Sequence, residues 1–211
     1  MQRAFGLDIP VTLEEVCSPS RSALLVYDMQ RGIIPHVREP ERLLERVGAV
    51  IEAARQGGVR VVYTRHASLP NELAGVFQLR TAMAWQRTNA VDEVESHFLP
   101  GSDAYALVDE MSPLASEAVI DKLAMSAFVG TPLELMLRDC GVVSLVVVGA
   151  VLEIGIEPTV RHGCDLGFIT VVVTDACGVV DEAAGTRSLE SLEYALMSLQ
   201  TDTETLTRLW S

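Results

Sequence analysis

Three positions in this 211-residue sequence have residue types and surroundings suited to hydrolytic chemistry. Asp28 directly follows an apolar run, residues 23–27, and a carboxylate there could act as a general acid or base. Lys122 follows a short apolar segment and could neutralise an anionic substrate or pair with that carboxylate. Gly155 lies after the apolar run 145–148, where a helical pattern begins and backbone N–H groups point outward. Because glycine has no side chain, a reaction here needs another nucleophile.

Each of these residues has an ordinary structural interpretation when it is taken alone. Asp28 could cap a strand end, and a single lysine such as Lys122 is most often a solvated surface group. Their functional interpretation depends on the three positions meeting in one cleft.

The sequence predicts alternating strands and helices. Strands are expected over 23–27, 59–64, 119–121, 145–148 and 169–174, and helices over 40–56, 132–140, 157–166 and 186–199. This alternation indicates a parallel sheet with helices on both faces. Ligands of such sheets bind beyond the carboxyl ends of the strands. That rule selects Asp28, Arg65, Lys122, residues 149–155 and Asp175.

Composition limits the classes of partner. The chain is 49% hydrophobic and 5% aromatic, which predicts one domain over 1–211 with an aliphatic core. The formal net charge of −13 argues against binding to nucleic acid or to an anionic membrane. No apolar run is long enough for a membrane span, and no signal peptide is recognisable. An anionic small molecule remains possible, because a local basic pocket can outweigh the overall charge.

The four cysteines, Cys17, Cys140, Cys164 and Cys177, are predicted to be free thiols in a cytoplasmic protein and to act as small buried apolar residues. Cys164 lies nine residues beyond Gly155 on the same predicted helix, and so on its opposite face and about 13 Å away. Cys177 follows a strand and is the least unfavourable substitute nucleophile. Residues 65–113 predict a long active-site loop with short helices.

Three motifs occur in order along most of the chain. They are D-M-Q at 28–30, K-x-x-x-S-A-F-x-G-T-x-L at 122–133, and VVVG followed by G-x-E-x-T-x-R and D-L-G-F within 146–168. Together they resemble the isochorismatase-like hydrolases, also called the cysteine hydrolase superfamily. The resemblance implies a three-layer α/β/α fold with a six-stranded parallel sheet, a homo-oligomer, and a site of Asp, Lys and usually Cys. Asp28 and Lys122 match the first two, and the cysteine position falls on Gly155.

The glycine determines which reactions the resemblance allows. Most relatives are amidohydrolases in which the cysteine forms an acyl-enzyme, and that route is closed here. Isochorismatases also have Ile-Gly at this point, as in residues 154–155, and cleave a vinyl ether with the aspartate as general acid. We therefore favour vinyl-ether hydrolysis of a small carboxylated molecule, with Asp28→Asn expected to abolish turnover without unfolding the protein. Glu153 occupies the position where the isochorismatases that this chain resembles have histidine.

Three alternatives remain open. The first is water-mediated amide hydrolysis with Glu153 helping to activate water, and the second is an inactive relative that binds a ligand or a partner. In the third, Gly155 is an engineered replacement of cysteine.

The resemblance also implies further contacts. A cis peptide bond is expected between Ala150 and Val151, lining an oxyanion pocket with the N–H of Gly155. Nicotinamidase-type relatives bind a metal, but the region after Arg65 has one histidine and no D-x-H, so we predict no metal and no cofactor. The candidate substrate contacts are Gln30, Arg65, Trp85, Phe128, Ala150, Val151 and Glu153.

Overall fold

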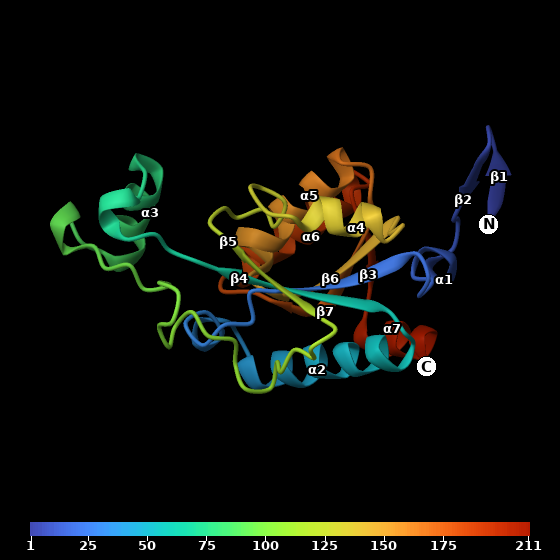
Figure 1. Cartoon of the computed structure of the whole chain (residues 1–211), viewed down its shortest axis with the longest axis horizontal. Helices are drawn as coiled ribbons and strands as arrows, with labels where there is room; N and C mark the ends of the chain where they lie inside the picture. Colours follow the sequence, from blue (N-terminus) through green and yellow to red (C-terminus); the bar gives the residue numbers. More distant parts are fainter.

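A computed structural model describes all residues, 1–211, and its centre is one six-stranded parallel sheet (Figure 1). The strands stand in the order β5-β4-β3-β6-β7-β8. Their bounds are β3 Ser22–Tyr27, β4 Arg60–His66, β5 Ala118–Lys122, β6 Ser144–Ala150, β7 Ile169–Gly178 and β8 Leu199–Thr201. The predicted parallel α/β architecture is confirmed.

Strand β3 lies inside the sheet and explains why the strands are continuous apolar runs. All six of its residues are buried, and it pairs with β4 on one side and β6 on the other. Its side chains alternate between two cores, with Leu24 and Val26 in one and Leu25 and Tyr27 in the other. Because both faces are covered, no polar alternation is needed.

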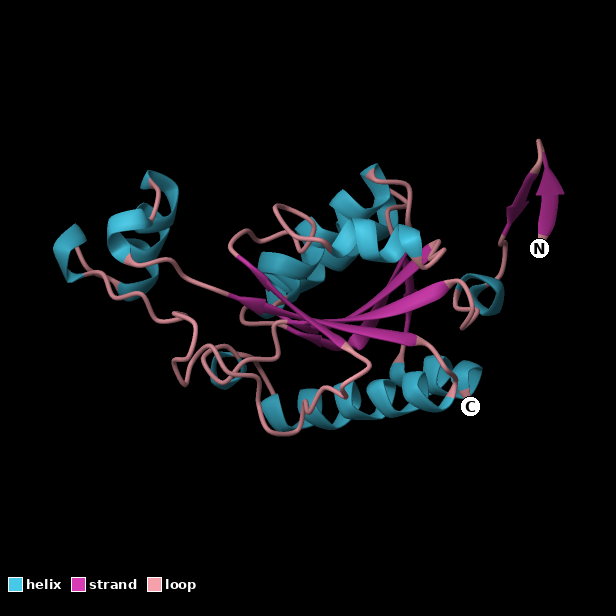
Figure 2. Ribbon diagram, in the orientation of Figure 1, coloured by secondary structure: helices cyan, strands magenta, loops and turns pink.

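Helices form the two outer layers (Figure 2). Helices α2 Pro40–Gln56 and α7 Thr203–Trp210 pack together on one face. The other face carries α4 Leu133–Asp139, α5 Glu157–Asp165 and α6 Glu182–Tyr194. One turn of π-helix, η4 Leu152–Ile156, joins β6 to α5.

Several bounds differ from the predictions. Strand β7 continues to Gly178, past the predicted end at 174, after a register shift opposite Val147 and Gly149. Helix α6 covers 182–194 and not 186–199: the Asp181 side chain caps its first turn, and the left-handed Leu196, with a φ of 55°, lies just past its end. Helix α7 and β8 complete the chain, and α7 has no counterpart among the predicted elements.

Two segments extend away from the body (Figure 1). One is an N-terminal hairpin, β1 Gln2–Ala4 and β2 Leu7–Ile9, followed by α1 Leu13–Val16. The other is the first part of the predicted loop 65–113, which contains α3 Val76–Gln86 and short 3-10 turns Asn71–Leu73 and Val91–Glu93. The predicted loop begins inside β4, and its last part returns to the body, where Leu107 pairs with Gln30. A further 3-10 turn, Ile34–His36, precedes α2. No helix is both long enough and apolar enough to span a membrane.

The C-terminal Trp210 provides a test of this packing. Its side chain is buried and its indole N–H donates to the carbonyl of Cys17 at 2.8 Å. Trp210→Phe should lower the free energy of unfolding by about 1–3 kcal/mol, because the Cys17 carbonyl loses its shorter hydrogen bond and the smaller ring leaves space in the core. Denaturant unfolding measures this loss. Tyr194→Phe, at a side chain that is 92% exposed, should change stability by less than about 0.5 kcal/mol. Equal stability of both variants would contradict the packing.

Candidate functional site

Asp28 and Lys122 form a buried ion pair at the carboxyl ends of β3 and β5. The Lys122 Nζ lies 2.6 Å from the Asp28 Oδ2, and the two residues are 2% and 3% exposed. The intervening strand β4 supplies Thr64, whose hydroxyl donates to the Asp28 Oδ1 at 2.7 Å. Asp28 has a φ of 45°, a left-handed conformation that few non-glycine residues adopt. The predicted meeting of these two charges is therefore present in the structure.

The segment after β5 covers this pair. Lys122 also donates to the carbonyl of Ala124 at 3.2 Å, and the Tyr27 hydroxyl donates to the carbonyl of Met125. The Lys122 ammonium lies 4.3 Å from the centre of the Tyr27 ring, within range of a cation–π interaction. The ion pair thus lies between β4, the 124–125 backbone and an aromatic ring.

The cis peptide bond expected between Ala150 and Val151 is present. Gly149, just before it, has a φ of 118°, and a Cβ there would lie 2.7 Å from the Tyr27 backbone nitrogen. The N–H of Gly155 donates to the carbonyl of Val151 at 3.0 Å. In this conformation that N–H is engaged within η4 and does not face an open oxyanion pocket.

Gly155 lies against Tyr27. A Cβ built on Gly155 would come 2.5 Å from the Tyr27 Cζ and 2.6 Å from its Cε1, and closer still to its hydroxyl. Tyr27 is 2% exposed. Burial and the nearby Asp28 charge raise the pKa of the Tyr27 phenol well above its ordinary value. The hydroxyl is therefore protonated at neutral pH.

Glu153, in η4, is bonded to the loop that follows β7. Its Oε1 accepts from the N–H groups of Val180 and Asp181, both at 2.8 Å, in the loop between β7 and α6. Glu153 and Glu157 line a surface hollow of about 320 Å³. The polar contacts of Glu153, which was expected to help activate water, are thus with that loop and not with Asp28 or Lys122.

Gln30 and Arg65 are occupied by structural contacts. The Gln30 amide donates to the carbonyls of His66 and Tyr105 and accepts from the His66 N–H. The Arg65 guanidinium lies 2.8 Å from the Asp121 carboxylate and stacks 4.2 Å from the Tyr105 ring centre. The Gln30 amide is thus engaged by its neighbours, and the Arg65 guanidinium is held by Asp121 through its Nε.

The two aromatic candidates lie apart. Phe128 is 7% exposed and stacks on Phe168 in the core beneath α4 and α5. Trp85 is 59% exposed on α3, a helix without any buried residue. The structure does not bring Trp85 and the ion pair into one pocket, because α3 extends away from the sheet (Figure 1).

All four cysteines are free, as predicted, but they are not all buried. Cys17 and Cys177 are buried, and burial raises the pKa of the Cys17 thiol to about 12 and that of Cys177 further. Cys164 is half-buried and contacts the Met197 carbonyl at 2.9 Å. Cys140 is exposed, which corrects the expectation of four buried thiols: it follows α4 at the helix end facing solvent.

Sequence reasoning missed three residues around the pair. Tyr27 belongs to an apolar strand, so nothing marks its hydroxyl as a neighbour of Gly155. Thr64 lies in the second strand, where its hydroxyl is equally unmarked. His66 is the third, and burial together with the Lys122 charge lowers its pKa, partly opposed by Asp28. All three lie at or near the carboxyl ends of β3 and β4, and that position is the one signal that could have singled them out.

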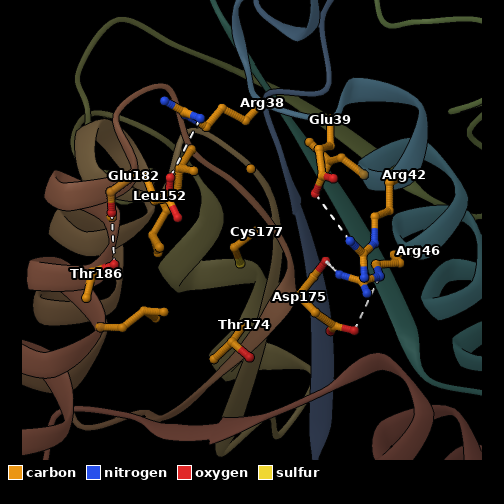
Figure 3. A pocket seen from close by; sticks show the side chains of 15 residues that line it. Arg38, Glu39, Arg42, Arg46, Leu152, Thr174, Asp175, Cys177, Glu182 and Thr186 are labelled. Carbon is orange, nitrogen blue, oxygen red and sulfur yellow. Dashed lines mark hydrogen bonds and ion pairs between the residues drawn. The ribbon is translucent and has the colours of Figure 1, made fainter.

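A larger cavity of about 490 Å³ lies between α2, β7 and α6 (Figure 3). Arg46 stands there beside Asp175, with an Nε to Oδ2 distance of 3.4 Å, and Glu182 and Thr186 occupy the other side. Asp28, Lys122 and Gly155 are not among its lining residues. No group of three or more His, Cys, Asp or Glu side chains is arranged to hold a metal.

Comparison with known proteins identifies a family and similar enzymes. Residues 22–205 match the model of the isochorismatase domain. The chain is 28% identical to the ureidoacrylate amidohydrolase RutB of Acinetobacter baylyi over 76% of its own length and 71% of that enzyme. It is 31% identical to RutB of Methylorubrum extorquens over 75% of its length, but it covers only 64% of that enzyme.

Solved structures show the same fold. A cysteine hydrolase from Pseudomonas syringae superposes with a TM-score of 0.75 at 23% identity, covering 91% of this chain and 93% of the other. An N-carbamoylsarcosine amidase from Thermoplasma acidophilum gives 0.70 at 24% identity, covering 87% and 96%. With the family match spanning most of its length, this chain belongs to the isochorismatase-domain family and is a hydrolase of that family.

Proposed function

We propose that this protein hydrolyses a C–N bond in a small carboxylated amide or ureido compound, with water as the nucleophile. The observation that carries this proposal is the Asp28–Lys122 pair, 2.6 Å apart, whose ammonium contacts the Tyr27 ring that fills the space at Gly155. The similar RutB proteins are named ureidoacrylate amidohydrolases, and a structural neighbour is named an amidase. These names favour amide hydrolysis over the vinyl-ether cleavage that the Ile-Gly pair suggests.

Asp28 is the group that moves the proton in this scheme. It accepts a proton from water as the water oxygen adds to the substrate carbonyl, and it then returns the proton to the departing nitrogen. Lys122 stabilises the negative charge that develops on the carbonyl oxygen. Thr64 holds the carboxylate by its 2.7 Å hydrogen bond. The reaction consumes one water and releases an acid and an amine.

Substrate access requires movement of the segment around Ala124 and Met125. The backbone carbonyls of these residues accept hydrogen bonds from Lys122 and Tyr27 and so cover the pair. Breaking two such bonds exposes the carboxylate and the ammonium together. Neither metal nor cofactor enters the scheme, and a location in the cytoplasm stays a prediction.

A second candidate function, ligand binding without turnover, is favoured by the burial of the pair. Asp28 and Lys122 are 3% and 2% exposed and line neither the 490 Å³ cavity nor the 320 Å³ hollow. In that case the ion pair is a remnant held by the cost of separating it. Turnover assays with ureidoacrylate, a panel of small amides and isochorismate separate the two functions and the vinyl-ether reaction.

Replacement of Asp28 tests the proposed chemistry. Asp28→Asn should lower kcat/KM for the best amide by about 10²–10⁴-fold, because the proton acceptor is lost. The variant also leaves Lys122 unpaired, which should cost about 3–5 kcal/mol of stability, so activity is compared per folded molecule. Asp109→Asn, at a surface ion pair with Arg31, is the matched control and should keep full activity. Turnover by Asp28→Asn at the wild-type rate would reject the mechanism.

The pH dependence of stability reports on the charges around His66. Its folded-state pKa is depressed, so between that value and the unfolded pKa near 6.5 the unfolded chain binds more protons. The contribution of His66 to the free energy of unfolding is therefore fully present above about pH 6.5 and is lost as the pH falls. His66→Gln should reduce the slope between pH 5 and 6.5 by at most about 1.4 kcal/mol per pH unit in denaturant titrations. If His36→Gln and His66→Gln gave the same slope of unfolding free energy against pH, this assignment to His66 would be wrong.

We also propose that the chain forms a homo-oligomer through α3. This helix has no buried residue, and Val76 and Phe77 are 87% and 72% exposed. Phe77→Glu should shift the sedimentation profile toward the monomer, because a charge would enter an apolar contact. Glu72→Gln, on the adjoining turn, is the control. A wild-type protein that sediments as a monomer would contradict the proposal.

A further inference from the structure

Gly155 is required by space and not by backbone conformation. It lies in η4 without a positive φ, so its backbone is one that any residue adopts. A residue with a Cβ would normally be favoured over glycine in such a helical turn. The obstacle is the Tyr27 ring, whose Cζ and Cε1 would stand 2.5 and 2.6 Å from that Cβ.

Tyr27 cannot move aside easily. Its ring is 2% exposed and packs in the core beneath α4, α5 and α6. Its hydroxyl is bonded to the Met125 carbonyl, and its backbone lies against Gly149 in the β3–β6 pairing. Displacing the ring would therefore break a hydrogen bond and open a cavity in the core.

Tyr27 also contacts both position 155 and the charged pair. The face of its ring is 4.3 Å from the Lys122 ammonium, while its hydroxyl end fills the space in front of Gly155. A side chain at 155 in place of the phenol would therefore enter the surroundings of Lys122. The phenol itself is held protonated by burial, which makes it a hydrogen-bond donor and not a nucleophile.

We propose that Tyr27 and Gly155 form one unit in which the phenol ring takes the place of a side chain at position 155 and thereby confines the site to water as its nucleophile. Tyr27 is then a positioning residue that determines the type of reaction. The clause about water rests on the proposed function, whereas the occupation of the space by Tyr27 does not.

Melting temperatures of combined variants test the occupation of this space without any turnover. Gly155→Ala should lower the melting temperature by about 5 °C, because the core is overpacked. In a Tyr27→Val background the same change should cause no loss. Tyr27→Phe is the matched control: it keeps the ring atoms that obstruct the Cβ, so Gly155→Ala should remain destabilising there. Gly155→Ala without any loss in the wild-type background would overturn the proposal, even if Tyr27→Val fails to fold.

Thiol labelling tests whether position 155 faces the charged pair. Gly155→Cys alone should leave the introduced thiol unreactive toward iodoacetamide, whereas Tyr27→Val with Gly155→Cys should make it at least ten times more reactive. Peptide mass mapping separates it from Cys140, the exposed native thiol. The labelling rate of the double variant should rise at a lower pH than that of Cys140, because Lys122 favours the thiolate. Equal labelling with and without Tyr27 would overturn the proposal, and so would a pH profile identical to that of Cys140.

These measurements also separate failure of this inference from failure of the proposed function. If Asp28→Asn keeps its activity but the melting and labelling results hold, the paired positions are real and the water mechanism is wrong. If Tyr27→Val with Gly155→Ala is as unstable as the sum of its single changes, Tyr27 does not occupy the space, whatever the activity assays show.

Discussion

The ion pair between Asp28 and Lys122 is the interaction on which the rest of this site depends. Removing two charges from water costs several kcal/mol for each ion, so the pair persists only if its remaining polar atoms are satisfied. Thr64, at 2.7 Å from the carboxylate, and the Ala124 carbonyl, at 3.2 Å from the ammonium, fulfil this requirement. The pair also joins β3 to β5 across β4, and so it fastens the carboxyl ends of three strands at one point.

This constraint explains the residues around the pair better than a direct role in substrate contact does. Gln30 and Arg65 direct their polar groups to the neighbouring backbone and to Asp121. They hold the strand ends at the spacing that a 2.6 Å ion pair needs. Glu153 fixes the loop after β7, because its carboxylate accepts two 2.8 Å hydrogen bonds from that loop's backbone. The residues selected by their position at the sheet edge thus form two groups. One group is the ion pair, and the other fixes the strand ends and loops around it.

Much of the fold could be predicted from the sequence because buried parallel strands are continuous apolar runs. That signal located β3, β4, β6, most of β7 and the short β5, and the ends of the β3 and β5 runs pointed to Asp28 and Lys122. The register shift in β7 and the capping of α6 by Asp181 were not predictable, because they depend on contacts with other elements. The long segment 65–113 has weak hydrophobic patterning, and α3 shows no buried face from which its position could be inferred.

The sequence alone could not show what fills the space beside Gly155, because the partner lies 128 residues earlier in a strand that appears purely structural. Gly149 and Gly155 illustrate the difference between two uses of the same residue. Gly149 has a φ of 118° and allows two strands to approach, whereas Gly155 has an ordinary backbone and makes room for a ring. The role of a glycine in a site therefore depends on which atoms occupy the space where a side chain would be. Here those atoms belong to a neutral phenol, so the charged groups in contact with Tyr27 and its neighbour are the ammonium of Lys122 and the carboxylate of Asp28, to which the proposed function assigns the chemistry.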